Sequence, residues 1–286
     1  MSLSYLLQRL STLLLVLLGV SIVVFSIVPL IPGSPARVRL GVQATDENIA
    51  RLEQQMGLDR PIYVQYANWI GGIVLRGDFG TSLITNTSIT REIQRRLPAT
   101  LSLAALALAI GLAIAIPLGL ASALRPGGKR DLAASMLSQV GVSVPDFWMG
   151  ILLILLFAET WGVLPSSGYA PVSEGIGAWL RYAILPALTA GLISGSIMTR
   201  FVRSALLEVL NQDYVRTARA KGVAPRKVLT KHVMRNAAIS IVTIVGLQMA
   251  TLLSSVVVVE IIFTWPGLGS LALTSTLQRD YPVLQA

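Results

Sequence analysis

Five long apolar stretches divide this chain of 286 residues. Four of them contain no charged residue, and the remaining one contains only Asp146. They are Leu10–Ala36, Leu97–Leu124, Leu132–Ala158, Tyr182–Thr199 and Asn236–Val259. Each approaches or exceeds the roughly 20 residues that cross a bilayer as a helix. The pattern predicts an all-α polytopic membrane protein, with a tail and first span in residues 1–31 and later spans at about 98–124, 132–158, 182–207 and 236–260.

Residues 32–97 lie between the first two spans and mix polar with apolar positions, which predicts short helices outside the bilayer. Pro32 and Gly33 mark the exit from the first span. Thr45, followed by acidic residues, starts one helix, and Gly57 ends it. A second helix is expected over Pro61–Leu75, because its apolar and aromatic residues recur at helical spacing. We place this region on the external side.

A basic island, Asn211–Asn236, separates the last two apolar stretches, and residues 208–235 form the connecting loop. It reads as two short helices around a corner. Asn211 or Asp213 caps the first helix, and Gly222 ends it in the left-handed conformation. Pro225 suits the first turn of the next helix.

The distribution of lysines gives the orientation. All four lie in two connections, which start near Arg125 and Asn211 and also carry many arginines: Lys129, Lys221, Lys227 and Lys231. Basic loops remain on the cytoplasmic side, so both connections and the N-terminus are expected to be cytoplasmic. The formal charge of +9 therefore reflects topology and contact with membrane lipids rather than nucleic-acid binding.

Sequence motifs for catalysis are absent, and so are cysteines. The chain has no phosphate-binding loop, no zinc-binding histidine pair and no Gly-x-Ser-x-Gly elbow, so no catalytic, cofactor or metal residue is expected. Asp146 and Glu260 are the acids within or beside the spans, and such groups are candidates for a transport pathway or gate. Each could equally be a hydrogen-bonded residue at a kink or interface. Pro145 predicts a kink or break in the third span.

The basic island resembles the permease signature of ATP-binding-cassette importers. Ala218 and Gly222 match its Glu-Ala-Ala-x-x-x-Gly pattern, while Arg216 and Thr217 replace the first two residues, as in dipeptide, oligopeptide and nickel importers. Further motifs on both sides of the island match those permeases and occur in the same order as in them: Pro32–Gly33, Gly57–Pro61, Gly77–Gly80, Val259–Glu260, Trp265–Gly269 and Arg279–Pro282. The chain resembles the first permease of the pair in a peptide-type importer, with the type I transmembrane fold.

Two departures accompany this resemblance. Ser240 stands where many relatives have proline, and Ser34 stands where aspartate is common. Relatives also continue beyond the Tyr-Pro pair into a sixth span. A sixth span is therefore expected but is absent from this chain, which shows five.

The resemblance implies a location in the bacterial cytoplasmic (inner) membrane and a set of partners. These are a second homologous permease, two ATPase subunits that use ATP and magnesium, and an external substrate-binding protein. Transport of di- or oligopeptides would follow alternating access, without enzymatic activity in this chain. The residues expected to couple to the ATPase are Asp213, Tyr214, Val215, Arg216, Ala218, Arg219, Lys221 and Gly222. Among them, Tyr214, Val215 and Ala218 are expected to form an apolar contact face.

Two other functions remain open at this level. A proton-coupled secondary carrier would use Asp146 and Glu260 and would need no ATPase. A non-transporting membrane scaffold would use the basic island only to recruit a partner. Glutathione and chelated nickel are further substrate candidates beside peptides.

Overall fold

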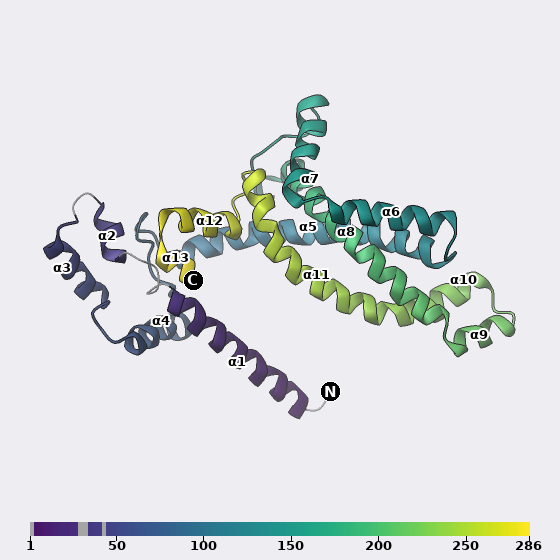
Figure 1. Cartoon of the computed structure of the whole chain (residues 1–286), viewed down its shortest axis with the longest axis horizontal. Helices are drawn as coiled ribbons and strands as arrows, with labels where there is room; N and C mark the ends of the chain where they lie inside the picture. Colours follow the sequence, from purple (N-terminus) through teal and green to yellow (C-terminus); the bar gives the residue numbers. More distant parts are fainter. Residues whose placement is uncertain (1–2, 28–33, 42–43) are drawn as a thin grey trace. The chain divides into compact units, whose positions relative to one another are not determined.

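The structure is a computed structural model that describes residues 3–27, 34–41 and 44–286. Within these ranges the chain forms helices and no strand, with one isolated bridge between Thr81 and Ser88 (Figure 1). It divides into unit 1, Met1–Arg95 with Leu271–Ala286, and unit 2, Arg96–Ser270. The exit predicted at Pro32 and Gly33 lies outside the described residues.

Unit 1 contains the first span and the short helices that follow it. Its helices are α1 (Leu3–Ile27), α2 (Pro35–Leu40), α3 (Asp46–Met56), α4 (Ile62–Arg76) and α13 (Tyr281–Gln285). The Thr45 hydroxyl accepts a hydrogen bond from the Asn48 amide at 3.3 Å. Gly57 ends α3 with a φ of 69°. Both predicted limits of α3 are therefore confirmed.

Aromatic packing joins α1 to α4 in unit 1. The Phe25 ring lies 5.4 Å from Tyr66 and 5.5 Å from Trp69, measured between centroids. The Tyr66 hydroxyl is also 2.8 Å from the Ser21 hydroxyl. Tyr66 and Trp69 thus hold α4 against the first span, in addition to suiting a membrane interface.

A buried carboxylate ties the last residues of the chain to the loop before α5. Asp280 accepts hydrogen bonds from the Ser82 hydroxyl and from the Leu83 amide, the latter at 3.0 Å. The Ser82 hydroxyl accepts in turn from the amides of Ile84 and Thr85. The Arg279–Pro282 motif therefore organises this loop.

The remaining elements form or enter unit 2, and α5 and α12 cross the boundary between the units. They are α5 (Ile89–Ala123), α6 (Lys129–Ser143), α7 (Asp146–Leu153), the π-helix η3 (Ile154–Thr160), η4 (Val172–Glu174), α8 (Ile176–Leu210), α9 (Asp213–Ala220), α10 (Pro225–Lys227), the π-helix η5 (Val228–Met234), α11 (Arg235–Ile262) and α12 (Leu268–Gln278). Among the described residues, four helices are long and apolar enough to span a membrane, or five if the bent pair around Pro145 is one span.

The start of α5 differs from the sequence prediction, whereas the break at Pro145 agrees with it. The second span was expected to open at Pro98, but α5 begins at Ile89 and contains Pro98. The Thr90 hydroxyl fixes this earlier start by donating to the Gly77 carbonyl and accepting from the Phe79 amide, both at 3.1 Å. The break at Pro145 is confirmed, because α6 and α7–η3 are bent by 101° there.

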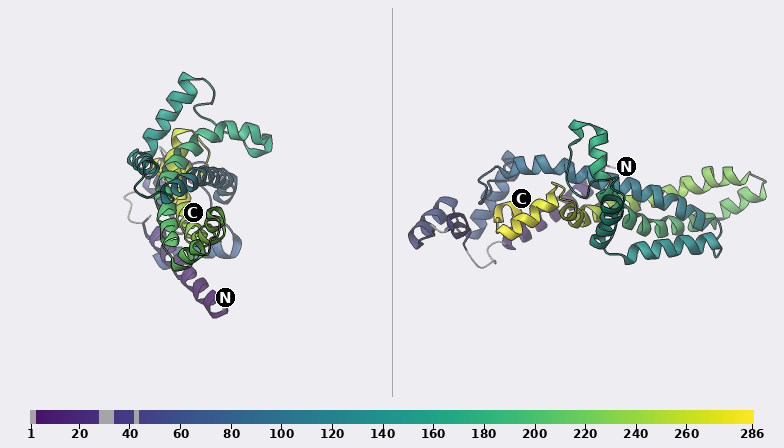
Figure 2. Two further views of the ribbon diagram at one scale, coloured as in Figure 1. Left: turned by 90° about the vertical axis from the view of Figure 1, so that its right-hand side faces the viewer. Right: turned by 90° about the horizontal axis from the view of Figure 1, so that it is seen from above.

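Helix α8 lies at the centre of unit 2 and packs against α6, α7 and α11 and against α5 (Figures 1 and 2). Glycines permit its close crossing with α5. A methyl group on Gly191 would come within 2.9 Å of the Ala107 carbonyl oxygen, and one on Gly195 within 3.0 Å of the Gly111 carbonyl oxygen. Small residues allow this approach in lipid, where close packing replaces the hydrophobic effect between helices.

Glu260 fixes the turn between α11 and α12. Its side chain is fully buried, and it accepts hydrogen bonds from the Thr100 hydroxyl at 2.6 Å and from the Ser270 amide at 2.9 Å. The Thr100 hydroxyl accepts from the Leu268 amide at 2.8 Å. The Trp265 indole donates to the Ala99 carbonyl at 3.0 Å. The carboxylate and Thr100 therefore satisfy the free amides at the start of α12.

The loop after η3 covers the same turn. The Gly168 amide donates to the Phe263 carbonyl at 3.0 Å, and the Tyr169 ring packs edge-on against Trp265 with centroids 4.7 Å apart. Burial raises the pKa of the Tyr169 phenol, and the negative charge of Glu174 raises it further. Tyr169 is therefore a neutral packing residue.

This turn generates a test of packing at Gly267. A methyl group there would lie 1.9 Å from a Glu260 carboxylate oxygen. We expect Gly267→Ala to lower the free energy of unfolding by about 1–3 kcal/mol, because the carboxylate would have to leave its donors. Thermal unfolding in detergent measures this loss.

Gly246→Ala is the matched control, since a methyl group at Gly246 meets no atom within 4 Å. Alanine at this helical position should leave stability unchanged or slightly raised. Equal melting temperatures for the two variants would contradict the packing described for Glu260.

Candidate functional site

Helix α9 forms the first half of the basic island and follows α8 after two residues. Gln212 is its N-cap and makes no side-chain capping bond. The prediction that Asn211 or Asp213 caps this helix is therefore wrong, because Asn211 belongs to the end of α8 and Asp213 already lies in the first turn of α9. Asp213 still favours the helix electrostatically from that turn.

Gly222 ends the turn after α9 with a φ of 74°. Its amide donates to the Arg219 carbonyl at 3.0 Å, and the next amide, of Val223, donates to the Ala218 carbonyl at 3.2 Å. No atom lies within 4 Å of where a β-carbon would be. Glycine is therefore required by the left-handed backbone rather than by lack of space, as predicted.

The two faces of α9 differ in what covers them. Val215 is fully buried and Ala218 is 7% exposed, and both pack in a cluster with residues of α8 and η5. Tyr214 is 43% exposed. Val215 and Ala218, which the sequence led us to expect at the ATPase, lie three positions apart on the face that packs α9 against its own chain. Tyr214 is the apolar member of the set that remains accessible.

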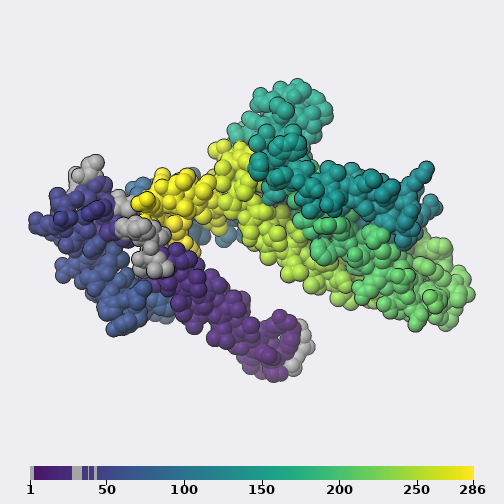
Figure 3. All heavy atoms as spheres, in the orientation of Figure 1, coloured from purple at the N-terminus to yellow at the C-terminus, as the bar shows by residue number. Residues whose placement is uncertain are grey.

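The accessible face of the basic island is strongly positive. Seven bases are exposed there, and none forms an ion pair with another residue in the described part of the chain: Arg216, Arg219, Lys221, Arg226, Lys227, Lys231 and Arg235. In Figure 3 the atoms of the island lie at one end of unit 2. A surface of this kind suits an acidic partner.

A cavity of about 320 Å³ lies where the island meets the end of α5. Its lining is mostly apolar and comprises Leu124, Leu210, Arg219, Val223, Pro225, Val228 and Leu229. The α5–α6 turn and the corner between α9 and α10 therefore lie at the same end of unit 2, as Figures 1 and 2 also show. This agrees with the placement of both basic connections on one side of the membrane.

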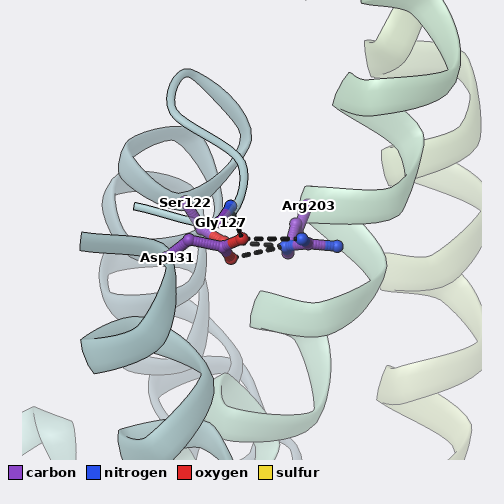
Figure 4. A network of polar contacts seen from close by, with 4 residues as sticks. All are labelled: Ser122, Gly127, Asp131 and Arg203. Atoms are coloured by element: carbon purple, nitrogen blue, oxygen red, sulfur yellow. Dashed lines mark hydrogen bonds and ion pairs between the residues drawn. The ribbon is translucent and has the colours of Figure 1, made fainter. Parts of the chain in front are cut away.

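An ion pair joins α6 to α8 at this end (Figure 4). The Asp131 carboxylate accepts from Arg203 Nε and Nη2, each at 2.8 Å, from the Gly127 amide at 2.8 Å and from the Ser122 hydroxyl. Arg203 Nε also lies 2.9 Å from the Ser122 oxygen. Asp131 is 6% exposed and Ser122 is 1% exposed. This pair was not predicted from the sequence, although an acid in an otherwise basic turn is a signal for it.

Asp146 and Glu260, the candidates for a pathway or gate, have different surroundings. Asp146 is partly buried in the first turn of α7, directly after the break at Pro145. The Glu260 carboxylate accepts hydrogen bonds from Thr100 and Ser270 around the turn before α12. This carboxylate therefore has a structural role, which does not favour the proton-coupled carrier.

No group of three or more histidine, cysteine, aspartate or glutamate residues in the described ranges could hold a metal ion.

Two family models match this chain. Residues 115–286 match the binding-protein-dependent transport system inner membrane component, and residues 2–104 match the N-terminal part of such membrane components. Together they include α9, the ion pair and the Glu260 turn.

Known proteins extend this likeness. The glutathione transport system permease protein GsiC of Salmonella choleraesuis is 42% identical over 284 residues, which cover 99% of this chain and 90% of the relative. The oligopeptide transport system permease protein AppB of Bacillus subtilis is 39% identical over 286 residues, with the same coverage. An inward-facing structure of the MetNI methionine ABC transporter matches 68% of this chain and 87% of its own, at 21% identity and a TM-score of 0.53.

The structural match supports the fold of an ABC importer transmembrane domain. The sequence matches support the assignment of the chain to a family. The chain therefore belongs to the family of binding-protein-dependent transport system inner membrane components, the permeases of ABC importers.

Proposed function

We propose that this chain is one of two permease subunits of an importer for small peptides, a class that includes glutathione. The observation that carries this proposal is the identity of about 40% to glutathione and oligopeptide permeases along nearly the whole chain. Hydrolysis of ATP belongs to two partner ATPases. The protein lies in the inner membrane with its N-terminus and basic island in the cytoplasm.

Helix α9 is the coupling element in this proposal. Its buried face fixes it to α8 and η5, while Tyr214 and the exposed bases face the cytoplasm. Tyr214 supplies apolar contact to the ATPase, and Arg216 and Arg219 reach acidic side chains on it. The seven exposed bases without acidic partners in the described chain support this assignment.

Alternating access follows from the movement of α9. Closure of the ATPases around ATP displaces α9, and the spans of unit 2 rotate against those of the second permease as rigid bodies. An external binding protein delivers the substrate to residues 37–96 and 161–181, which the charge distribution assigns to the external side.

Purification with native partners tests this function. We expect two ATPase subunits and a second permease to remain bound in mild detergent. ATP hydrolysis should rise when an external binding protein loaded with glutathione or an oligopeptide is added, because the loaded protein favours the closed ATPase pair.

A different result would support the carrier instead. Purified chain without any ATPase, combined with proton-driven flux that Asp146→Asn or Glu260→Gln abolishes, would overturn the importer.

Gly222→Val tests the coupling role of α9. Valine at a φ of 74° is strained by about 1–3 kcal/mol, so the end of α9 should change conformation. We expect peptide uptake to fall strongly in reconstituted vesicles, while basal ATP hydrolysis continues. The measured quantity is ATP hydrolysed per peptide transported.

Ala224→Val is the control, because Ala224 is exposed at the same corner and has a φ of −52°. It should behave as wild type, and Gly222→Asn should be intermediate, since asparagine tolerates the left-handed conformation. Wild-type coupling in Gly222→Val would rule out the required geometry.

A further inference from the structure

The link between α8 and α9 poses a mechanical problem for coupling. Only Asn211 and Gln212 lie between the two helices, and their backbone turns sharply, from ψ of 0° at Asn211 to ψ of 146° at Gln212. A connection this short would act as a hinge if nothing else held α9. A push on α9 would then bend the hinge without moving the spans.

Apolar packing removes part of this freedom. Val215 and Ala218 of α9 belong to one buried cluster with Val202 and Leu206 of α8. Val202 in turn contacts α5, since a methyl group on Gly119 would come within 2.7 Å of its side chain. This packing resists separation of the helices, but it has no directional bonds that fix rotation or sliding.

The Asp131–Arg203 pair supplies those directional bonds. Arg203 lies seven residues, about two helical turns, before Leu210 at the end of α8. Its guanidinium binds both oxygens of Asp131, and that carboxylate also binds Ser122 of α5 and Gly127 of the α5–α6 turn (Figure 4). A bidentate fork constrains orientation as well as distance. One carboxylate thus connects α5, the α5–α6 turn, α6 and α8.

We infer that Asp131 and Arg203 are positioning residues for coupling: they make the α5–α6 turn and the α8–α9 corner move as one rigid body. The inference rests on the proposed function of α9. Force from the ATPase on α9 then reaches α5 and α6 through the ion pair as well as through the backbone of α8.

The chemistry of the pair supports a mechanical role. Burying the Asp131 carboxylate is costly, and well-packed apolar residues often provide equal or greater stability than a buried ion pair. Every oxygen site on the carboxylate has a donor, which is the arrangement in which a buried polar network specifies one geometry.

Distance measurements between two spin labels test the inference. The chain has no cysteine, so Arg125→Cys and Ala224→Cys introduce unique labels at exposed positions of the α5–α6 turn and of the corner that follows α9. The labelled subunit is assembled with its partners and measured without nucleotide and with ATP trapped. We expect one narrow distance distribution, the same in both states.

Asp131→Asn and Arg203→Lys should each broaden this distribution and make it depend on ATP. Lysine keeps the charge of Arg203 but lacks the planar fork. In transport assays with glutathione and trialanine as probes, both variants should consume about three- to tenfold more ATP per molecule transported. Arg200→Lys and Glu208→Gln are matched controls, because both residues are exposed on α8.

Two outcomes would overturn the inference. One is a folded Asp131→Asn variant whose distribution stays narrow and independent of ATP. The other is a loss of melting temperature with unchanged ATP use per transported molecule, which would make the pair purely structural. If no ATPase associates, the proposed function fails, but the width of the distribution in the isolated subunit still shows whether the pair holds the turn to the corner.

Discussion

The close crossing of α5 and α8 sets the geometry of unit 2. Glycines at 111, 191 and 195 bring the two backbones to distances that a single methyl group would prevent. In lipid, such contacts provide much of the attraction between helices, since both sides are equally apolar. The crossing fixes the position of α8, and α6, α7, α9 and α11 all pack against α8. The position of the basic island therefore follows from a few residues without side chains.

Two networks of buried polar side chains have defined roles in unit 2. Glu260 and Thr100 satisfy the start of α12 at one end of unit 2. Asp131 and Arg203 join three helices at the other end. An unpaired polar group in hydrocarbon is expensive, so each of these networks persists only because its members have partners. Both networks stabilise ends of helices, where the backbone itself leaves free donors and acceptors.

Local signals in the sequence predicted local structure well. Thr45, Gly57, Pro145 and Gly222 each act through backbone conformation or a neighbouring amide, which a single sequence reveals. The identity of the covering surface was not predictable in this way. Val215 and Ala218 form an apolar face by periodicity, but periodicity does not distinguish the protein's own core from a partner. Asp131 and Arg203 lie 72 positions apart, so only the fold brings them together.

The central claim is that the exposed face of α9 contacts an ATPase, while its other face packs against α8 and η5 of this chain. Photocrosslinking from single cysteines in the assembled complex tests it most directly, because the chain has none of its own. A benzophenone label on Tyr214→Cys should crosslink to an ATPase subunit with a yield that changes on ATP binding. Val215→Cys should resist labelling, since that position is fully buried. Crosslinks to the ATPase from position 215, with none from position 214, would contradict the account.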